Sequence, residues 1–414
     1  MLSEKEKIDL ITRISLDINE VKDIDLLLER ILTNVRKFSN ADAGSIYLKE
    51  NNRLRFSYTQ NETQQKRLEP GKKLIYNTFS QPIDNMSIAG YVANNCKTVN
   101  IPDAYHLNDT SLPYSFDSKI DEKANYRTCS MLTVPMTNQR DDVLGVMQII
   151  NAQDDNGKIM PFSPSDEPLI MHFATSAALA VERAQMTRNI ILRMISMAEL
   201  RDPKETGAHV NRVAAYSVEL FEEWAKGKLL SVKEIEGQKD VLRMAAMLHD
   251  VGKVAISDLI LKKPARLTVD EYDVMKGHTF IGARLFRDIQ SAFDEIAVEV
   301  ALNHHEKWDG TGYPGHIDPI SEKPLPGFEG EEGQPRPKRG EEIPLFGRIV
   351  ALADVYDALC SRRSYKEPWE ENQILDEIHK SSGTHFDPEV TNAFFSCFDV
   401  IKSIATRYPE EESE

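Results

Sequence analysis

The pattern of hydrophobic positions changes near residue 200 of the chain. Before that point, short apolar runs separated by turn-forming residues predict strands. The runs are Ala43–Lys49, Leu54–Thr59, Thr98–Ile101, Ser130–Pro135 and Val143–Asn151. Residues 4–39 carry apolar side chains at helical spacing and predict two helices, and Ser87–Asn95 predicts a short helix between strands. The first part therefore predicts an α+β domain with an antiparallel sheet.

Residues 166–200 lack glycine, and they lack proline after Pro168. Apolar positions recur there at alternating spacings of three and four residues, with one polar interruption. They are Ile170, Phe173, Ala177, Ala180, Ala184, Thr187 (the polar one), Ile191, Met194 and Ala198. A heptad stripe of this kind favours a parallel dimeric coiled coil. The alternative is a long helix that packs on its own domain.

From Thr206 onward the chain shows helical spacing and no alternating runs. The expected helices are Val210–Trp224, Val241–His249, Val269–Asp288, Ile296–Asn303, Ile343–Leu359 and Trp369–Ser381. Gly315–Glu342 interrupts them, because it is rich in proline, glycine and charged residues. This segment predicts a long loop, of a length typical of lids or disordered segments.

Charge narrows the class of ligand. The chain of 414 residues has 50 Lys and Arg against 66 Asp and Glu, which gives a net charge of −16. Binding of duplex nucleic acid normally requires a basic face, so this balance argues against it. A small phosphorylated ligand stays compatible, because local cations or metal ions can outweigh the overall field.

No apolar run reaches the ~18–20 residues that a membrane-spanning helix needs. The charged start of the chain lacks the apolar core of a signal peptide. The four cysteines are scattered and form no CxxC pair. We therefore expect a cytoplasmic protein without membrane insertion.

Six of the ten histidines fall between residues 209 and 316. His249 and Asp250 follow one apolar helix, His304 and His305 follow another, and Asp354 lies inside a third. Unpaired charge in such settings is costly, so these residues need a metal or polar partners. Each residue singly could be an ordinary core or surface side chain, and this applies most to His278 and to the Glu205/His209 pair four residues apart.

Taken jointly, the candidates are Glu205, His209, His249, Asp250, His278, His304, His305 and Asp354. Imidazole and carboxylate ligands suit iron, manganese or zinc. Eight ligands exceed the need of one ion, so two or three bridged ions are expected. Paired metal ions hydrolyse phosphoesters by binding the attacking and leaving oxygens together.

These residues resemble the HD superfamily of metal-dependent phosphohydrolases. The run 304–314, which reads HHEKWDGTGYP, resembles the signature of the HD-GYP subfamily. The resemblance covers about residues 195–403. It implies a bacterial phosphodiesterase that opens cyclic di-GMP to the linear dinucleotide pGpG and in many cases continues to GMP, with iron or, alternatively, manganese as the metal.

The resemblance also assigns roles by position. All eight candidates become metal ligands, with Glu205 typical of members that hold a third ion. Lys253 and Asp250 become catalytic residues, while Arg363, Lys366 and Tyr313 become substrate contacts. Residues 315–342 depart from the family pattern, because they are longer than the usual connection after the signature.

The first part resembles a GAF domain of the cyclic-nucleotide phosphodiesterase type over about residues 23–185. The resemblance rests on the runs 116–122, 126–136 and 144–151, and on the family's NKFDE pattern. That pattern appears as Asn151, Phe162, Asp166 and Glu167, with Ala152 in place of its lysine. A small-molecule ligand such as a cyclic nucleotide is implied, and the alternative is a GAF domain that only dimerises.

The expected architecture is an α+β GAF domain joined by a long helix to an all-α HD-type domain. Its segments are an N-terminal helix (1–22), the GAF sensor (23–165), a linker helix in a dimeric coiled coil (166–200), the catalytic domain (201–403) and an acidic tail (404–414). We expect a homodimeric enzyme. The alternatives are hydrolysis of another cyclic dinucleotide such as cyclic GMP-AMP, hydrolysis of a nucleotide monoester, and a non-catalytic cyclic di-GMP receptor.

Overall fold

The computed structural model describes residues 18, 21–69, 72–76, 78–109, 112–199, 207–360 and 369–409. The chain divides into two compact units, Met1–Arg188 and Asn189–Glu414. Several expectations lie outside the described residues: most of the N-terminal helix, residues 410–414 of the acidic tail, and Glu205, Arg363 and Lys366.

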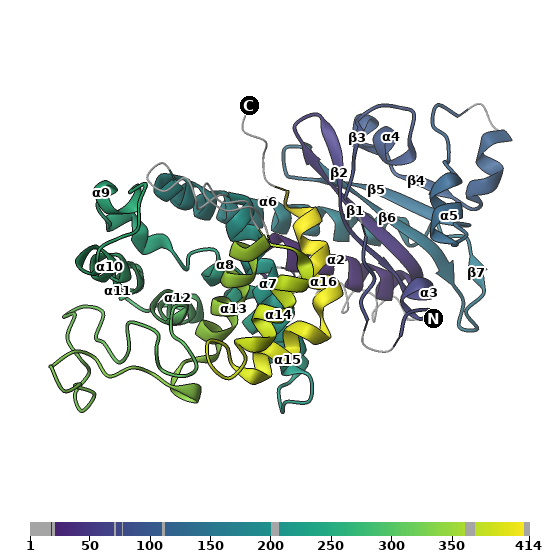
Figure 1. Cartoon of the computed structure of the whole chain (residues 1–414). Coiled ribbons are helices and arrows are strands. Elements are labelled where there is room, and N and C mark those ends of the chain that lie inside the picture. Colours follow the sequence, from purple (N-terminus) through teal and green to yellow (C-terminus); the bar gives the residue numbers. More distant parts are fainter. Residues whose placement is uncertain are drawn as a thin grey trace. The chain divides into compact units, whose positions relative to one another are not determined.

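The first unit is built on a seven-stranded antiparallel sheet (Figure 1). The strands are β1 (Ala41–Glu50), β2 (Arg53–Asn61), β3 (Ser80–Pro82), β4 (Val99–Ile101), β5 (Met131–Thr137), β6 (Val143–Gln153) and β7 (Ile159–Met160). Their order is β3-β2-β1-β6-β5-β4, and β7 pairs with β6. The predicted antiparallel sheet is confirmed. The short edge strands β3 and β7 were not expected, because two or three residues carry too little alternation to stand out.

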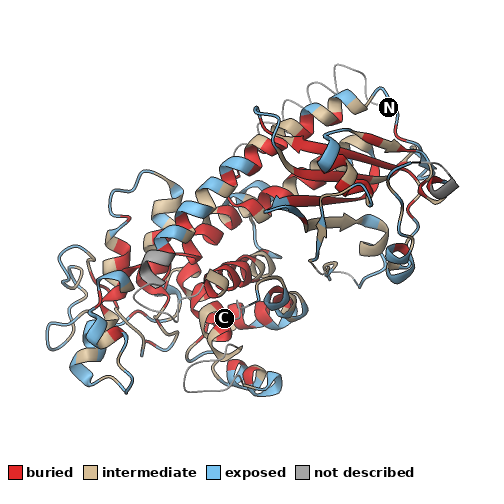
Figure 2. Cartoon of the chain, turned by 90° about the horizontal axis from the view of Figure 1, so that it is seen from above, coloured by how far each residue is buried: buried red, intermediate tan, exposed pale blue. Residues whose placement is uncertain are grey.

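Helices cover both faces of this sheet, so its central strands β1, β5 and β6 are largely buried (Figure 2). Helix α2 (Ile24–Ser39) packs on β1 and β2, and α4 (Ile88–Asn95) packs on β5 and β6. Adjacent β1 side chains point to opposite faces, and Ile46 and Tyr47 are both buried. Helix α2 begins where the Asp23 carboxylate accepts the amides of Asp25 and Leu26. The shorter helices are α3 (Glu62–Gln65), η1 (Ala104–Asp109) and α5 (Lys119–Ala124).

Asn151 of the NKFDE pattern has a structural role. Its backbone φ is 57°, in the left-handed region. Its side chain accepts the amide of Cys129 at 2.7 Å and donates to the carbonyl of Arg127 at 2.8 Å. These bonds tie the end of β6 to the segment that leads into β5.

Helix α6 spans Glu167–Glu199, and the burial of its first half corrects the dimer seam that was expected there. Five of the heptad positions are 0–2% exposed in the single chain: Ile170, Phe173, Ala177, Ala180 and Ala184. Polar contacts also join α6 to the first unit, since Asn138 donates to Glu182 and Arg188 pairs with Asp25. The alternative interpretation, a helix packed on its own domain, therefore holds for residues 170–184. The reason is that small alanines let the helix approach its own domain closely.

The second unit is helical, and its described residues contain no strand (Figure 1). Its elements are α7 (Gly207–Ala225), α8 (Val232–Ala246), η2 (Val251–Ala255), α9 (Asp258–Leu261), α10 (Val269–Lys276), α11 (His278–Arg284), α12 (Ala292–Asn303), η3 (Gly340–Glu342), α13 (Leu345–Cys360), α14 (Glu371–Lys380), α15 (Pro388–Ser396) and α16 (Phe398–Arg407). Helices α7, α8, α12 and α13 pack together around one apolar core.

Two expected helices have different bounds. Helix α8 begins at Val232, because Ser231 and Glu234 form a capping box, and it ends at Ala246, so His249 lies in the following turn. The single helix expected over 269–288 is divided into α10 and α11 at Gly277. This break lets the backbone of His278 approach Gly252 closely, since a Cβ on Gly252 would lie 1.9 Å from the His278 carbonyl oxygen.

The predicted loop at residues 315–342 folds back on itself. The amide of His316 donates to the Arg336 carbonyl at 2.9 Å, and the amide of Arg336 donates to the Phe328 carbonyl at 2.8 Å. The His316 ring stacks on Phe328 with centroids 4.0 Å apart. Backbone pairing and ring stacking therefore give the loop a defined conformation without a strand, and its only helical turn is η3 at its end.

Candidate metal centre

Three helices and two turns carry the candidate ligands of the second unit. His209 lies on α7, His278 begins α11, His304 follows α12 at its C-cap, and Asp354 lies on α13. His249 and Asp250 occupy the turn between α8 and η2. Helices α7, α12 and α13 pack their apolar faces into the common core, and each carries a candidate ligand or ends at one.

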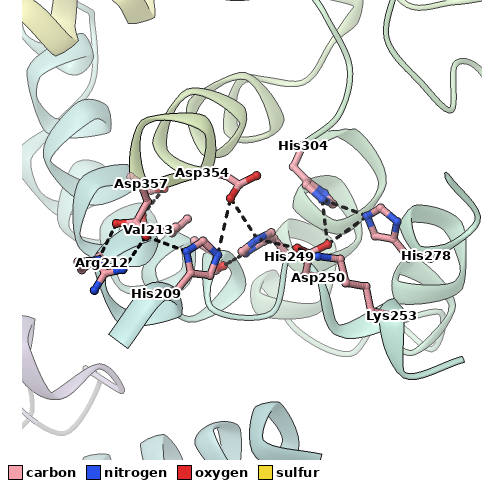
Figure 3. A network of polar contacts seen from close by, with 12 residues as sticks. His209, Arg212, Val213, His249, Asp250, Lys253, His278, His304, Asp354 and Asp357 are labelled. Atoms are coloured by element: carbon pink, nitrogen blue, oxygen red, sulfur yellow. Dashed lines mark hydrogen bonds and ion pairs between the residues drawn. The ribbon is translucent and has the colours of Figure 1, made fainter. Parts of the chain in front are cut away.

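The structure brings seven of the eight predicted ligands into two groups, each with potential ligand atoms within 4.8 Å of one another. One group holds Asp250, His278, His304 and His305, and the other holds His209, His249 and Asp354. The eighth, Glu205, lies outside the described residues. Residues that are spread over about 150 positions of the sequence thus lie close together (Figure 3).

The histidine tautomers suit metal binding. The Nδ1 atoms of His249 and His278 lie 2.8 Å and 2.7 Å from the carbonyl oxygens of Ala246 and Met275. His304 Nδ1 lies 3.1 Å from the Val300 carbonyl oxygen. A carbonyl can only accept, so each Nδ1 carries the proton and each Nε2 presents a lone pair inward.

Two of these lone pairs face each other, because His278 Nε2 and His304 Nε2 are 3.4 Å apart. Neither can donate to the other while both Nδ1 protons are committed. A metal ion with nitrogen ligands about 2.1 Å away holds adjacent ligands about 3.0–3.4 Å apart. The spacing of the two nitrogens therefore fits a shared cation.

Asp250 lies between the two groups. Its Oδ1 faces His278 Nε2 at 3.1 Å and His304 Nε2 at 3.5 Å, and its Oδ2 is 3.3 Å from His249 Nε2. In the second group, Asp354 Oδ1 lies 3.6 Å from His209 Nε2 and 4.0 Å from His249 Nε2. The two oxygens of Asp250 thus face both groups, and this carboxylate would help to hold a divalent ion at either group (Figure 3).

The electrostatics of the first group keep its ligands in the forms that bind metal. Burial lowers the pKa of the His304 and His305 imidazoles, so both are neutral at neutral pH. Burial alone would raise the pKa of Asp250, but Lys253 and His249 outweigh burial, and the pKa lies well below its usual value. A charged carboxylate beside neutral imidazoles is the protonation state that metal coordination requires.

Sequence reasoning missed Asp357, which orients His209. Asp357 Oδ2 lies 2.9 Å from His209 Nδ1. Arg212 Nε and Nη2 donate to the two oxygens of Asp357 at 2.6 Å and 2.8 Å. Both side chains are almost fully buried. A carboxylate behind a ligand histidine fixes its tautomer and direction. The only sequence signal was a second aspartate one turn after Asp354.

Lys338 was also missed, because it lies in the proline- and glycine-rich loop. Its ammonium donates to the Asn303 side-chain oxygen, and Asn303 is the last residue of α12. Glu306 is 2% exposed, and its Oε1 accepts the amide of Gly315 at 2.6 Å. The loop is therefore fastened on both sides of the His304–His305 pair.

The signature turn places Tyr313 against a candidate ligand. The Tyr313 ring stacks on the His305 ring with centroids 4.9 Å apart and planes at 29°. Gly312 has no space for a side chain, since a Cβ there would lie 2.2 Å from the Lys307 amide nitrogen. Gly310 adopts φ of 82°. Glycine at these positions lets the turn close over the histidines.

Family comparisons agree with this arrangement. Residues 23–181 match the model of the GAF domain family, and residues 206–359 match that of the HD domain family. The chain contains a GAF domain followed by an HD domain. These matches confirm the predicted fold class and the predicted resemblance to the GAF and HD families. An HD domain implies divalent metal binding, which fits the two groups of ligands.

Two curated relatives match a little more than half of the chain. The chain is 34% identical over 232 residues to 3'3'-cGAMP-specific phosphodiesterase 2 of Vibrio cholerae, covering 56% of this chain and 39% of that protein. It is 40% identical over 230 residues to a cyclic di-GMP phosphodiesterase of the same organism, covering 54% and 42%. The chain spans about two fifths of the length of these two relatives.

Among solved structures, the GAF domain of an Acinetobacter phosphoenolpyruvate-protein phosphotransferase matches 45% of this chain and 99% of its own. The identity is 19% and the TM-score is 0.33. Within the described part of the chain, no helix combines the length and apolarity needed to cross a membrane.

Proposed function

We propose that the chain is a metal-dependent phosphodiesterase that hydrolyses cyclic di-GMP to pGpG and can continue to GMP. The observation that carries the proposal is the position of Asp250 between two groups of ligands. Two divalent ions held there would activate water and offset the charge of a phosphate. Relatives named as cyclic di-GMP phosphodiesterases support this choice of substrate.

The proposed ligands are the seven residues of the two groups, together with Glu205 for a third ion. Iron is the metal we propose, with manganese as the alternative, because mixed imidazole and carboxylate sets suit both. Thiolate ligands, which are typical of structural zinc sites, are absent from both groups.

Lys253 is the proposed general acid or charge stabiliser. Its ammonium lies 2.7 Å from Asp250 Oδ2 and is largely buried. From there it can donate a proton to a leaving oxygen or hold a hydrogen bond to a phosphate oxygen. Arg363 and Lys366 are the proposed contacts of the phosphate that is not cleaved, and Tyr313 is proposed to contact the substrate beside His305.

Another cyclic dinucleotide is the second candidate substrate. The relative named as specific for 3'3'-cGAMP shares 34% identity with this chain, so cyclic GMP-AMP is a specific alternative. The GAF domain is proposed to bind a small molecule such as a cyclic nucleotide and to regulate the HD domain in a homodimer. We propose a cytoplasmic location for the protein.

A substrate panel tests the proposed function. The purified full chain, loaded with Fe(II) or with Mn(II), is incubated with cyclic di-GMP, 3'3'-cGAMP and a nucleotide monoester, and the products are separated by chromatography. The expected result is pGpG from cyclic di-GMP at the highest kcat/KM. Preference for 3'3'-cGAMP would select the second candidate. Tight cyclic di-GMP binding without turnover by either metal form would identify a receptor and contradict the proposal.

A further inference from the structure

An exposed aromatic ring lies at the edge of the candidate metal centre. Tyr272 belongs to α10, the helix that leads into His278, and it is 46% exposed. Its ring meets the Tyr313 ring nearly at right angles, with centroids 6.1 Å apart and planes at 81°. Tyr313 in turn stacks on His305. A continuous row of rings therefore leads from a candidate metal ligand to the surface.

A cation accompanies this row. The Lys276 ammonium lies 4.9 Å from the Tyr272 ring centroid and 5.9 Å from the Tyr313 ring centroid. It also pairs with Asp273 at 2.7 Å. Two rings set at a right angle, with a lysine over both, form a corner that offers a stacking face and a hydrogen-bond donor together.

Core packing does not account for the position of Tyr272. Helix α10 has no buried residue, so its side chains contribute little to the apolar core. The helix is held at its start by the Thr268–Glu271 capping box and by Lys263, which pairs with Glu271. A large ring kept half exposed on such a helix gains little from folding. Its geometry toward Tyr313 is the feature that needs an explanation.

We propose that Tyr272, Tyr313 and Lys276 form a nucleobase-binding corner in which Tyr272 stacks on one base of the dinucleotide. Stacking on an aromatic side chain serves any base, because every base has a π-face. Lys276 adds selectivity, since guanine presents two acceptors, O6 and N7, on one edge, whereas adenine presents a donor beside its N7. The corner therefore favours guanine. This inference rests on the proposed function.

Steady-state kinetics of the metal-loaded full chain with cyclic di-GMP tests the corner. Tyr272→Ala should raise KM about tenfold while kcat stays within about twofold, because base stacking contributes to binding and not to the chemical step. Tyr272→Phe should restore the KM, since the ring and not the hydroxyl is required. Phe395→Ala removes another exposed ring, 38% exposed on α15, and serves as the matched control.

A second variant tests base selectivity. Lys276→Met should lower the ratio of kcat/KM for cyclic di-GMP over 3'3'-cGAMP, and metal content measured by elemental analysis should stay at the wild-type value. If the wild type turns over normally and the KM of Tyr272→Ala is unchanged, the inference about the corner is wrong and the proposed function still stands. An unchanged substrate ratio in Lys276→Met overturns the assignment of guanine selectivity. Absence of wild-type turnover of any cyclic dinucleotide overturns the proposed function and the corner with it.

Discussion

The Lys253 ammonium nitrogen lies 2.7 Å from Oδ2 of Asp250. The other oxygen of the same carboxylate faces His278 and His304. An ammonium group has no lone pair and cannot ligate a metal. Lys253 is therefore placed to act on a ligand of the metal centre or on a bound phosphate without being a metal ligand.

Lys253→Met should separate binding of metal from catalysis. We expect metal content to stay at the wild-type level, because the ligand set is intact, and kcat to fall by about a hundredfold, which is the lower range for loss of a general acid. Elemental analysis and steady-state kinetics check both parts. Lys262→Met is the control, since Lys262 is 44% exposed and pairs with Asp258. Loss of metal in Lys253→Met would contradict this role.

Asp250→Asn should remove both metal content and turnover. The amide keeps the size of the side chain but loses the charge that joins the two groups of ligands. We expect less than half of the wild-type metal by elemental analysis and no measurable hydrolysis. Asp288→Asn is the control, because the Asp288 side chain is 82% exposed. Full metal content and activity in Asp250→Asn would show that the carboxylate does not bridge ions.

Asp357→Ala should destabilise the HD domain strongly. It would leave Arg212 buried without its carboxylate partner, and breaking such a pair costs about 3–5 kcal/mol. Urea unfolding measures this loss, and Asp376→Ala on the exposed face of α14 is the control. The double variant Arg212→Met/Asp357→Leu should recover most of the stability, because no buried charge is left alone. A small loss in the single variant would mean that water reaches Arg212.

Glu306 should make the metal-free protein less stable as pH rises. Burial raises the pKa of its carboxyl from 4.5 to about 7, although the Gly315 amide and Lys338 oppose the rise. Between these pKa values the folded state binds more protons than the unfolded state, so the free energy of unfolding falls with increasing pH. The expected loss from about pH 5 to about pH 8 is about 2 kcal/mol.

Glu306→Gln should abolish this part of the pH dependence, because the amide cannot ionise and its oxygen still accepts the Gly315 amide. Urea unfolding in the presence of a chelator, at both pH values, compares the variant with the wild type. Glu341→Gln changes an exposed carboxylate of the same segment and should unfold like the wild type. Identical pH dependence in Glu306→Gln and the wild type would place the ionisation elsewhere.

The dimer is testable on the exposed face of α6. Met186, Ile190 and Met194 are 65%, 48% and 39% exposed and recur every four residues. Ile190→Glu should therefore weaken self-association measured by analytical ultracentrifugation, whereas Asn189→Glu on the neighbouring face should not. Ala184→Glu is unsuitable, because Ala184 is fully buried in its own chain and the charge would unfold it. A monomeric wild type at micromolar concentration would contradict the homodimer.

The sequence singled out the candidate ligands that stand in conspicuous surroundings, and the structure brings them together. His249–Asp250 and His304–His305 follow apolar helices, where polar pairs are costly without partners. Asp357 lies in the same apolar helix as Asp354, but its role could not be predicted, because its partner Arg212 is 145 residues away and the packing of α7 on α13 joins them. The break at Gly277 was missed for a similar reason, since the close approach of Gly252 to His278 depends on tertiary contact.

The heptad stripe, in contrast, led to the prediction of a dimer seam that the structure corrects over residues 170–184. Periodicity reports that one face of α6 is apolar, but it does not report what covers that face. Ala177, Ala180 and Ala184 are buried by their own chain. Short side chains serve close packing within a domain as well as they serve a thin dimer seam, so the sequence could not separate the two.

The fastening of loop 315–342 has a consequence for how this protein can be altered. Lys338 holds the last residue of α12, and Gly315 is held by Glu306, so both ends of the loop meet the turn that carries the histidine pair. Shortening the segment to a minimal connection would release Asn303 and Glu306 together. The loop is thus part of the scaffold of the site, and foreign sequence is best tolerated near its exposed Gly327, which is about equally far along the chain from both anchors.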